Sequence, residues 1–292
     1  MAENKILITT DSGCDMPQEF FEHFKLPRIK ICYICGEEVL PDHGIDSETD
    51  RFYAMQAEGV ACSTTGINTV QAEQFFNEQL AAGLPIIHIA FSGALSNTCS
   101  VMKAVAERIN ANNPEADITV LDSHAASAGQ AQLLTGLLEQ RDAGASKEEA
   151  GEWYLNNHLK YNHFYTVSEL KSLKRSGRVK AAAAFWGDIL SINPLMTVDT
   201  EGRLIPYKKE RGRKKVLKSM IAEMKERIEN PEEQVILISH GQCLEDAETL
   251  KAMVLENFTV KDVKINRIGP VIGCHTGPTV LALFFKGQER DF

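Results

Sequence analysis

The sequence predicts an α/β protein of two domains, an N-terminal parallel-sheet α/β domain at residues 1–160 and a C-terminal α+β domain at residues 161–292. Three observations support this prediction. The chain has 292 residues, which exceeds the usual size of a single domain. Short apolar segments alternate with helical segments through the first half, a pattern typical of a parallel sheet covered by helices. From Asn162 onward this alternation gives way to a different order of elements.

The N-terminal domain is expected to contain four strands and six helices. The strands are apolar runs at Lys5–Thr10, Arg28–Cys35, Pro85–Ala90 and Ile118–Leu121. The helices are expected at Pro17–Phe24, Asp50–Glu58, Thr69–Ala82, Ser96–Asn110, Ala125–Arg141 and Lys147–Leu159. The fifth of these carries a stripe of leucines at helical spacing, which is typical of a core-facing helix.

The C-terminal domain begins with a small-residue helix in the segment KAAAAFWGDIL, which starts at Lys180. Two strands, Pro194–Asp199 and Arg203–Lys208, flank the turn Thr200-Glu201-Gly202 and predict a hairpin. A basic helix, a strand, a helix and a final strand then follow, at Lys214–Ile228, Gln234–Ser239, Glu245–Asn257 and Val263–Ile268.

The composition excludes several classes of protein. Hydrophobic residues make up 43% and charged residues 24% of the chain, values that are ordinary for a globular protein with a sizeable core. The formal net charge of −9 argues against a broad nucleic-acid-binding face. No apolar run approaches the roughly 20 residues that span a bilayer, and the N-terminus does not resemble a signal peptide. We therefore expect a cytoplasmic protein without stable membrane insertion.

Seven cysteines are dispersed along the chain, and we expect them to be reduced thiols. Cys32 and Cys35 form a CxxC motif, which could bind a metal or perform redox chemistry. No second CxxC or histidine pair follows at zinc spacing, and the motif lies in the strand-like run IKICYIC. Redox CxxC pairs usually open a helix, so a packed strand is the interpretation favoured here.

Small and hydroxyl-bearing residues gather in four segments, three of which directly follow a predicted strand. The segments are TTDSGCD (Thr9–Asp15), CSTTGIN (Cys62–Asn68), FSGALSNT (Phe91–Thr98) and LDSHAAS (Leu121–Ser127). The carboxyl ends of strands in an open α/β sheet meet at one crevice, where ligands bind. Ser96 lies at the start of a helix, where free N–H groups favour an anion, although it could simply cap that helix. Thr64 and Thr65 are expected to open another helix, which favours a shared anion site.

His275 lies in the segment GPVIGCHTGP, in a glycine-bounded turn ahead of an apolar run. The flanking glycines permit close approach of a ligand, although a structural role for this histidine is equally compatible with the sequence. Ser96 and His275 could form a hydrolase triad with an aspartate, but no GxSxG motif occurs. No GxGxxG or GxxxxGK[ST] motif supports a nucleotide cofactor, and we expect no cofactor or metal.

Basic residues cluster twice, in LKRSGRVK (Leu173–Lys180) and YKKERGRKK (Tyr207–Lys215). Such clusters are usually solvated surface. In an acidic chain they could also form a docking surface for an acidic partner or a phosphorylated product.

These segments together resemble the motifs of the DegV family, in the same order and over nearly the whole chain. TTDSGCD is similar to its DST motif, CSTTGIN to TSQPS, and FSGALSNT to SSGLSGTY. LDSHAAS is similar to its DS-containing strand end, LKRSGRV to its GR segment, and GPVIGCHTGP to its HxGPG segment.

The resemblance implies a ligand tunnel between the two domains that holds a long-chain fatty acid of about 16 to 18 carbons, each buried methylene contributing about 0.8 kcal/mol. It implies that Thr64, Ser96 and His275 bind the carboxylate, with Ser92 and Thr65 as further ligand-binding candidates. It also implies that the protein presents the acyl group to a fatty acid kinase for phospholipid metabolism, with Arg178 and Arg211 as docking residues. Candidates for the tunnel wall are Phe164, Phe185, Trp186, Ile189, Leu190 and Phe284.

The chain departs from the family motifs at several positions. Gly13 replaces the threonine of DST, Gly93 the second serine of SSG, and Asn97 the glycine of LSG. The TSQPS motif reads Thr64-Thr65-Gly66-Ile67-Asn68.

Taken together, the segments and the family resemblance favour a fatty-acid-binding protein without catalytic activity. A Ser96–His275 acyl hydrolase or transferase and a protein-interaction module that uses the basic clusters are the alternatives.

Overall fold

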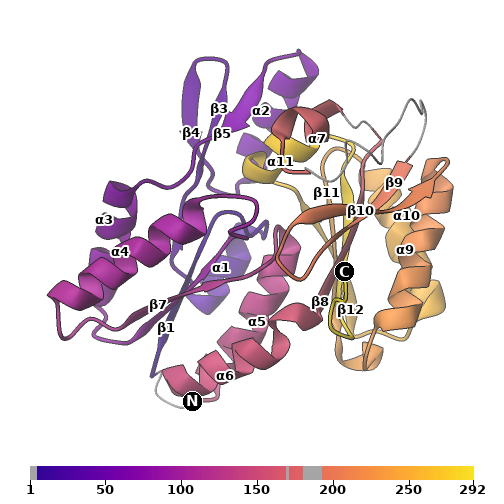
Figure 1. Ribbon diagram of the computed structural model, residues 1–292. Coiled ribbons are helices and arrows are strands. Elements are labelled where there is room, and N and C mark those ends of the chain that lie inside the picture. The colour runs from indigo at the N-terminus through magenta and orange to yellow at the C-terminus, as the bar shows by residue number, and fades with distance from the viewer. Residues whose placement is uncertain (1–4, 169–170, 180–192) are drawn as a thin grey trace.

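The computed structural model describes residues 5–168, 171–179 and 193–292 and shows the expected parallel α/β half followed by an α+β half (Figure 1). The first half contains a four-stranded parallel sheet, sheet A, with the order β2-β1-β6-β7. Its strands are β1 (Leu7–Asp11), β2 (Arg28–Ile29), β6 (Ile86–Ala90) and β7 (Ile118–Asp122). Ile8 of β1 and the apolar residues of β6 are buried, as the near-continuous apolar runs predict for a sheet covered on both faces.

Helices cover both faces of sheet A. Helix α4 packs on β6 and β7, whereas α5 packs on β1, and the two helices lie on opposite sides of the sheet in Figure 1. The helices of this half are α1 (Gln18–Phe24), α2 (Asp46–Ala57), α3 (Thr69–Leu80), α4 (Thr98–Asn112), α5 (Ala128–Asp142) and α6 (Lys147–Asn157). The predicted leucine stripe of α5 is confirmed as core, because all four leucines are buried. A short 3₁₀ turn, η1 (His158–Lys160), leads into the second half.

The strand predicted at Arg28–Cys35 is two strands in two different sheets. After β2 the chain leaves sheet A, and the Ile31 N–H donates to the Ser12 hydroxyl at 2.9 Å instead of continuing the ladder. The next residues form β3 (Cys32–Cys35), the central strand of the small antiparallel sheet B, with the order β4-β3-β5. The outer strands, β4 (Glu38–Pro41) and β5 (Cys62–Thr64), are too short to be recognised from hydrophobic periodicity.

The second half is built on the six-stranded sheet C, with the order β10-β9-β8-β13-β11-β12. Its strands are β8 (Tyr161–Thr166), β9 (Asn193–Val198), β10 (Leu204–Glu210), β11 (Val235–His240), β12 (Asp262–Arg267) and β13 (Leu281–Lys286). The predicted hairpin is confirmed, since β9 and β10 pair antiparallel around residues 199–203. The predicted segment at residues 180–190 lies outside the described residues.

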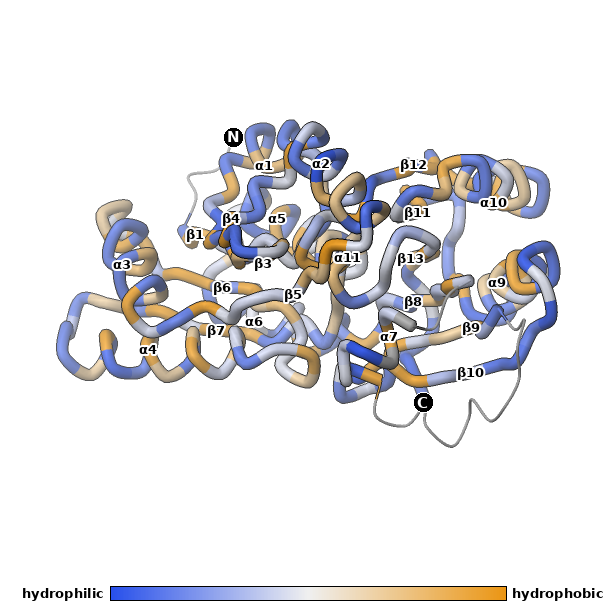
Figure 2. The backbone as a smooth tube through the Cα atoms, turned by 90° about the horizontal axis from the view of Figure 1, so that it is seen from above, coloured by the Kyte–Doolittle hydropathy of each residue, from blue (hydrophilic) through white to orange (hydrophobic). Residues whose placement is uncertain are grey.

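Sheet C lies between helices of both halves. One face carries α9 (Arg213–Arg227) and α10 (Leu244–Asn257), and the other contacts α5 of the first half (Figure 1). Helices α7 (Lys171–Ser176) and α11 (Pro270–Thr276) pack on each other, and the 3₁₀ turn η2 (Pro231–Glu233) precedes β11. Figure 2 shows hydrophobic stretches along β6 and at α11, whereas helices such as α4 and α10 alternate between hydrophobic and hydrophilic residues. Because the largest core includes residues of both halves, the domain boundary at residue 160 stays a prediction.

Helix α11 is fixed at its N-terminal end by two buried carboxylates from the first half. The Gly269 N–H donates to Asp15 at 2.9 Å, and the Val271 N–H donates to Asp42 at 3.4 Å. Burial and, to a smaller extent, the neighbouring Asp42 raise the pKa of Asp15 from 3.8 to about 8, although hydrogen bonds from Ser127 and Gly269 oppose this rise. Burial also raises the pKa of Asp42, to about 6. Asp15 therefore retains its proton at neutral pH in the folded protein.

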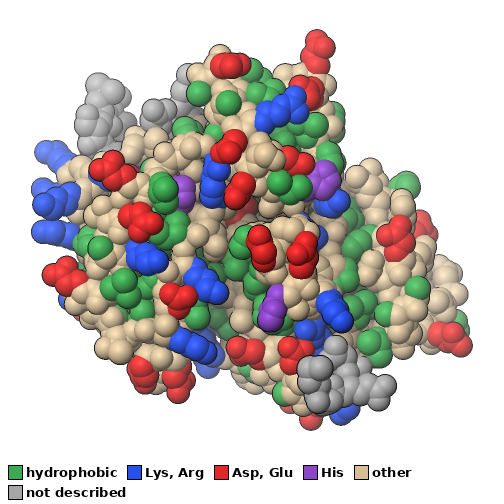
Figure 3. All heavy atoms as spheres, turned by 180° about the vertical axis from the view of Figure 1, so that it is seen from behind, with side chains coloured by type: hydrophobic (Ala, Val, Ile, Leu, Met, Phe, Trp, Pro, Cys, Tyr) green, Lys and Arg blue, Asp and Glu red, His purple; other side chains and the backbone are tan. Residues whose placement is uncertain are grey.

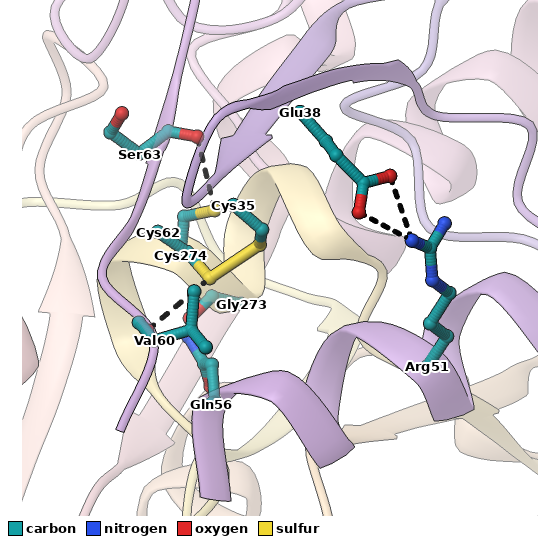
Figure 4. The surroundings of a disulfide bond; sticks show 9 residues. All are labelled: Cys35, Glu38, Arg51, Gln56, Val60, Cys62, Ser63, Gly273 and Cys274. Atoms are coloured by element: carbon teal, nitrogen blue, oxygen red, sulfur yellow. Dashed lines mark hydrogen bonds and ion pairs between the residues drawn. A yellow bond between two sulfur atoms is a disulfide. The ribbon is translucent and has the colours of Figure 1, made fainter. Parts of the chain in front are cut away.

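A disulfide joins Cys35 of β3 to Cys62 of β5, so the prediction of reduced thiols is wrong for these two residues (Figure 4). The two residues are direct partners in the antiparallel register, with Cα atoms 4.4 Å apart. That separation is typical of a pair that does not exchange hydrogen bonds across the strands. The prediction of a packed strand is confirmed for the CxxC segment, and Cys32 is a free thiol.

We expect alkylation of the unfolded, unreduced protein to label five of the seven cysteines, because Cys35 and Cys62 are joined. Reduction before alkylation should raise the number to seven, as measured by intact mass. Cys35→Ser should lower the free energy of unfolding by about 2–4 kcal/mol. Cys32→Ser, on the same strand but outside the disulfide, is the matched control. Seven labels without reductant would contradict the disulfide.

Asp15→Asn should change how stability depends on pH. Because the pKa of Asp15 is higher in the folded than in the unfolded protein, the folded state binds an extra proton between about pH 4 and pH 8. The wild-type contribution therefore falls as pH rises through this window, at up to about 1.4 kcal/mol per pH unit. Asparagine keeps the carbonyl acceptor for Gly269 without titrating.

Urea unfolding of both proteins at pH 5, 6.5 and 8 measures this effect. The stability of Asp15→Asn relative to the wild type should increase steadily with pH. Glu115→Gln, which removes one exposed negative charge, controls for the change in net charge. A stability difference between the wild type and Asp15→Asn that is independent of pH would show that Asp15 is ionised in the folded protein.

Candidate functional site

A cavity of about 1150 Å³ lies between the two halves of the protein. The loops after β5 and β6 supply one wall, through residues 64–66 and 93–97. The opposite wall comes from sheet C and α11, which contribute apolar residues such as Val271, Ile272 and Phe284. The predicted position of a cavity between the halves is therefore confirmed, and α11 contributes both apolar residues and the polar His275 to its lining.

Thr64 and His275 both line the cavity and are within hydrogen-bond distance of each other. The Thr64 hydroxyl at the end of β5 lies 2.9 Å from His275 Nε2 on α11, and both side chains are half-buried. His275 lies near the C-terminal end of a short helix, not in the predicted turn. The sequence analysis named both residues, and the structure brings together two positions that are 211 residues apart.

The imidazole of His275 is neutral at physiological pH. Burial, together with the positive charges of Arg178 and Arg175, lowers its pKa from 6.5 to about 4. A neutral imidazole has one donor and one acceptor nitrogen, and Nε2 takes either role toward the Thr64 hydroxyl depending on the tautomer. This pair can therefore offer a proton to a ligand oxygen without carrying a fixed charge.

Ser96 lines the same end of the cavity at the start of α4. Its hydroxyl donates to the Thr98 hydroxyl at 3.0 Å and accepts the Thr98 N–H at 3.2 Å. The capping interpretation is supported only in part: Asn97, not Ser96, is the N-cap residue of α4, and Ser96, one residue before it, accepts the N–H of the first residue of the helix. Its half-buried hydroxyl also lines the cavity, so the structure is compatible with a ligand-binding role as well.

Thr65 and Ser92 occupy different positions relative to the cavity. Thr65 lines it and donates to the Cys32 carbonyl at 3.4 Å. Ser92 is fully buried, and its hydroxyl donates to the Gly202 carbonyl at 2.9 Å, which ties the β9–β10 turn to the first half. It does not belong to the described lining.

The prediction that Thr64 and Thr65 open a helix is wrong. Thr64 ends strand β5, and α3 begins at Thr69. Asn68 caps this helix, because its side chain accepts the Gln71 N–H while the Gln71 side chain accepts the Asn68 N–H. Thr64 therefore reaches the cavity from a strand, and among the predicted hydroxyls it is Ser96 that stands at a helix start.

The two predicted docking arginines differ in their positions. Arg178 follows α7, is exposed and lines the cavity, so it stands where a ligand could meet solvent. Arg211 is exposed between β10 and α9 and does not belong to the described lining. Within the second basic cluster, Lys208 pairs with the buried Glu223 and Arg213 pairs with Asp246, so part of that cluster is structural.

Only one of the predicted tunnel residues within the described chain lines the cavity. Phe284 does so, whereas Phe164 points to the opposite face of sheet C and packs in the core under α9 and α10. Phe185, Trp186, Ile189 and Leu190 lie outside the described residues. The sequence analysis missed Phe91 and Tyr165 as lining residues, although the alternation of strand β8 could have placed Tyr165 opposite Phe164.

The described contacts do not assemble a hydrolase triad. The Ser96 hydroxyl is bonded to Thr98, and His275 Nε2 is bonded to Thr64. Within residues 5–168, 171–179 and 193–292, no carboxylate is hydrogen-bonded to His275, and no group of three His, Cys, Asp or Glu side chains could hold a metal ion. No helix in the same ranges is long and apolar enough to cross a membrane. What the arrangement offers is a polar, proton-donating group of side chains in a cavity whose lining also includes apolar residues and the charged residues Asp199, Glu201 and Arg203.

Comparisons with known proteins agree with this architecture. A sequence model described as "Uncharacterised protein, DegV family" matches residues 5–287. A DegV domain-containing protein of Clostridium perfringens is 39% identical over 290 residues, covering 98% of this chain and 99% of that protein.

Two solved structures share the fold. One, titled as fatty acid binding of a DegV family protein from Thermus thermophilus, has a TM-score of 0.88 at 23% identity and covers 97% of this chain and 100% of its own. The other, a DegV family protein from Eubacterium eligens loaded with heptadecanoic acid, has a TM-score of 0.81 at 18% identity, with 97% and 100% covered. With a family model that matches nearly its full length and a relative that shares 39% of its residues, this chain belongs to the DegV family.

Proposed function

We propose that the protein binds a long-chain fatty acid in the cavity between its halves and presents the acyl group to a kinase. The observation that carries the proposal is the polarity of the cavity. Thr64, Ser96, His275 and Arg178 gather polar groups in one part of the lining. Apolar side chains from both halves, including Phe91, Ile268, Val271, Ile272 and Phe284, line other parts of the cavity, and a second polar group comes from Asp199, Glu201 and Arg203.

The polar groups suit a carboxylate. Hydroxyl groups and a neutral imidazole can donate hydrogen bonds to its oxygens, and the Arg178 charge lies close enough to His275 to lower its pKa. A bound carboxylate would oppose this lowering, because a negative charge favours the protonated imidazole. The head group would therefore be oriented by several hydrogen bonds without a fully buried ion pair.

The apolar wall would supply most of the affinity. Burial of a methylene contributes about 0.8 kcal/mol, so about 15 methylenes contribute on the order of 12 kcal/mol before the cost of ordering the chain. Fatty acid binding by the Thermus thermophilus protein and the heptadecanoic acid in the Eubacterium eligens protein support this ligand class, because both proteins share the fold over 97% of this chain.

Presentation to a kinase is the role that fits a carrier whose polar end reaches solvent at Arg178. The protein itself would supply no catalytic group, and the phosphoryl transfer would take place on the partner. A kinase that uses a nucleotide donor works in the cytoplasm, which agrees with the location expected from the sequence. Disulfides are rare in the cytoplasm, so a Cys35–Cys62 disulfide that persists in the cell would argue against this location, whereas reduced thiols would agree with it.

We expect Thr64→Ala to weaken fatty acid binding about five- to tenfold, because it removes one hydrogen bond of about 1 kcal/mol at the carboxylate. The dissociation constant for a fluorescent fatty acid, measured by titration of the delipidated protein, tests this. Thr135→Ala is the matched control, since that hydroxyl bonds the Ala131 carbonyl within α5, outside the described cavity lining.

Two results would contradict the carrier proposal. If the wild-type protein neither contains nor takes up a fatty acid, as judged by native mass spectrometry, the cavity serves another ligand. If it turns over p-nitrophenyl acyl esters and His275→Ala abolishes this turnover, the protein is an acyl hydrolase or transferase instead.

Charge reversal at Arg178 and Arg211 should reduce the rate at which a fatty acid kinase phosphorylates the bound acid. The expected effect is a fall of about tenfold in kcat/KM for the loaded protein, which diminishes as salt is added. Lys251→Glu, on α10, is a control for a change of net charge elsewhere. An unchanged kcat/KM in the Arg178→Glu/Arg211→Glu variant would exclude these residues from the docking surface.

A further inference from the structure

Strand β8 separates two environments by its alternation. Phe164 is fully buried and belongs to the core beneath α9 and α10. His163 and Tyr165, on either side of it in the sequence, line the cavity instead. Because successive side chains of a strand point to opposite faces, His163 and Tyr165 share the face of sheet C that is directed toward the first half.

The Tyr165 hydroxyl has no hydrogen-bond partner within the described residues, although Tyr165 is only 6% exposed. Its cross-strand neighbours cannot provide one through their side chains, because they are Ala282 on β13 and Met196 on β9. Other buried tyrosines differ in this respect. The hydroxyls of Tyr53 and Tyr154 donate to the carbonyls of Ile268 and Asp122.

An unpartnered hydroxyl in this position requires an explanation. Leaving a buried polar group without a partner is unfavourable, and most such groups in native proteins are satisfied. A phenylalanine would fill the same space without this penalty. His163 also has an unpartnered nitrogen, Nε2, but a Cβ at residue 129 would lie 2.0 Å from it, so that nitrogen faces the backbone of α5. The buried Ser127 hydroxyl also lines the cavity without a hydrogen-bond partner, but it lies close enough to the Asp15 carboxyl to lower the pKa of that group. Tyr165 is therefore the group on strand β8 that is available to a ligand.

The cross-strand neighbours of Tyr165, Ala282 and Met196, are apolar. Ala282 and Phe284 lie on the neighbouring strand, and Ile268 and Val280 also line the cavity. The carboxylate-binding groups proposed above come from other elements, namely β5, the start of α4, α11 and the segment after α7. A hydrogen bond from Tyr165 would thus be directed to the chain of the ligand and not to its carboxylate.

We propose that the preferred ligand is a long-chain fatty acid with an oxygen substituent on its chain, a hydroxy or oxo acid, whose oxygen accepts a hydrogen bond from Tyr165. This inference rests on the proposed function and specifies its ligand class. A site built to hydrogen-bond a substrate oxygen discriminates strongly against the analogue without it, because the buried group then stays unpaired. Unsubstituted acids would bind through the same carboxylate site, but more weakly.

The test compares stearic acid with 9-, 10- and 12-hydroxystearic acid and 12-oxostearic acid. Dissociation constants are measured by displacement of a fluorescent fatty acid from the delipidated wild-type protein and from Tyr165→Phe. We expect at least one oxygenated acid to bind the wild type about tenfold more tightly than stearic acid, and this preference to disappear in Tyr165→Phe. Stearic acid itself should bind Tyr165→Phe as tightly as the wild type, or more tightly.

Tyr161→Phe is the matched control, because Tyr161 lies on the same strand and is equally buried but does not belong to the described cavity lining. It should keep the wild-type preference. If the wild type binds stearic acid and all oxygenated acids equally, or if the preference survives in Tyr165→Phe, the inference is overturned while the proposed function stands. If none of these acids binds the wild type, the proposed function itself fails.

Discussion

The contact of two buried carboxylates with the N-terminal end of α11 is the constraint on which the site depends. Asp15 and Asp42 come from the first half, whereas the N–H groups that they accept belong to Gly269 and Val271 of the second. A side chain at position 269 would meet Asp15, since a Cβ there would lie 2.9 Å from its carboxylate oxygen. His275 occupies the other end of this helix, so its distance from Thr64 is set by how the two halves are joined.

A protonated Asp15 suits this role better than a charged one. Two ionised carboxylates side by side in a buried position would repel each other, whereas one neutral and one charged group can both accept N–H donors. The N-terminal end of the helix also favours residual negative charge at Asp42. The joint between the halves is therefore coupled to pH, although the head-group site is built from residues that stay neutral, Thr64 and His275.

Much of the fold could be predicted from the sequence because its signals are local. The apolar runs of β1, β6 and β7 and the leucine stripe of α5 specify a covered parallel sheet. Sheet B could not be predicted in the same way, because β5 has three residues and is stabilised by the disulfide and by its pairing with β3. Neither contact leaves a periodic signal in the sequence. For the same reason, Thr64 was expected at the start of a helix.

For the candidate site too, local motifs could be predicted from the sequence, whereas contacts between distant elements could not. Motif resemblance identified Thr64, Ser96 and His275, and the structure places all three on one cavity. The partner of each polar group could not be predicted, since these contacts are fixed by packing between distant elements. Ser92, for example, donates a hydrogen bond to the turn between β9 and β10. On strand β8, the neighbouring side chains of Phe164 and Tyr165 belong to two different hydrophobic cores, which the sequence does not distinguish.

Two of the departures from the family motifs are glycines that lie against a bulkier side chain of a neighbouring loop. A Cβ at Gly66, where the TSQPS motif has glutamine, would lie 2.2 Å from the side-chain oxygen of Asn97, which replaces the glycine of LSG. The bulk that is lost at one position therefore reappears at the other. In the same way, a Cβ at Gly13 would lie 2.7 Å from the Phe91 ring, which lines the cavity. A side chain added at Gly66 or Gly13 alone would therefore clash unless its neighbour shifted, so each glycine and its neighbour must be considered together.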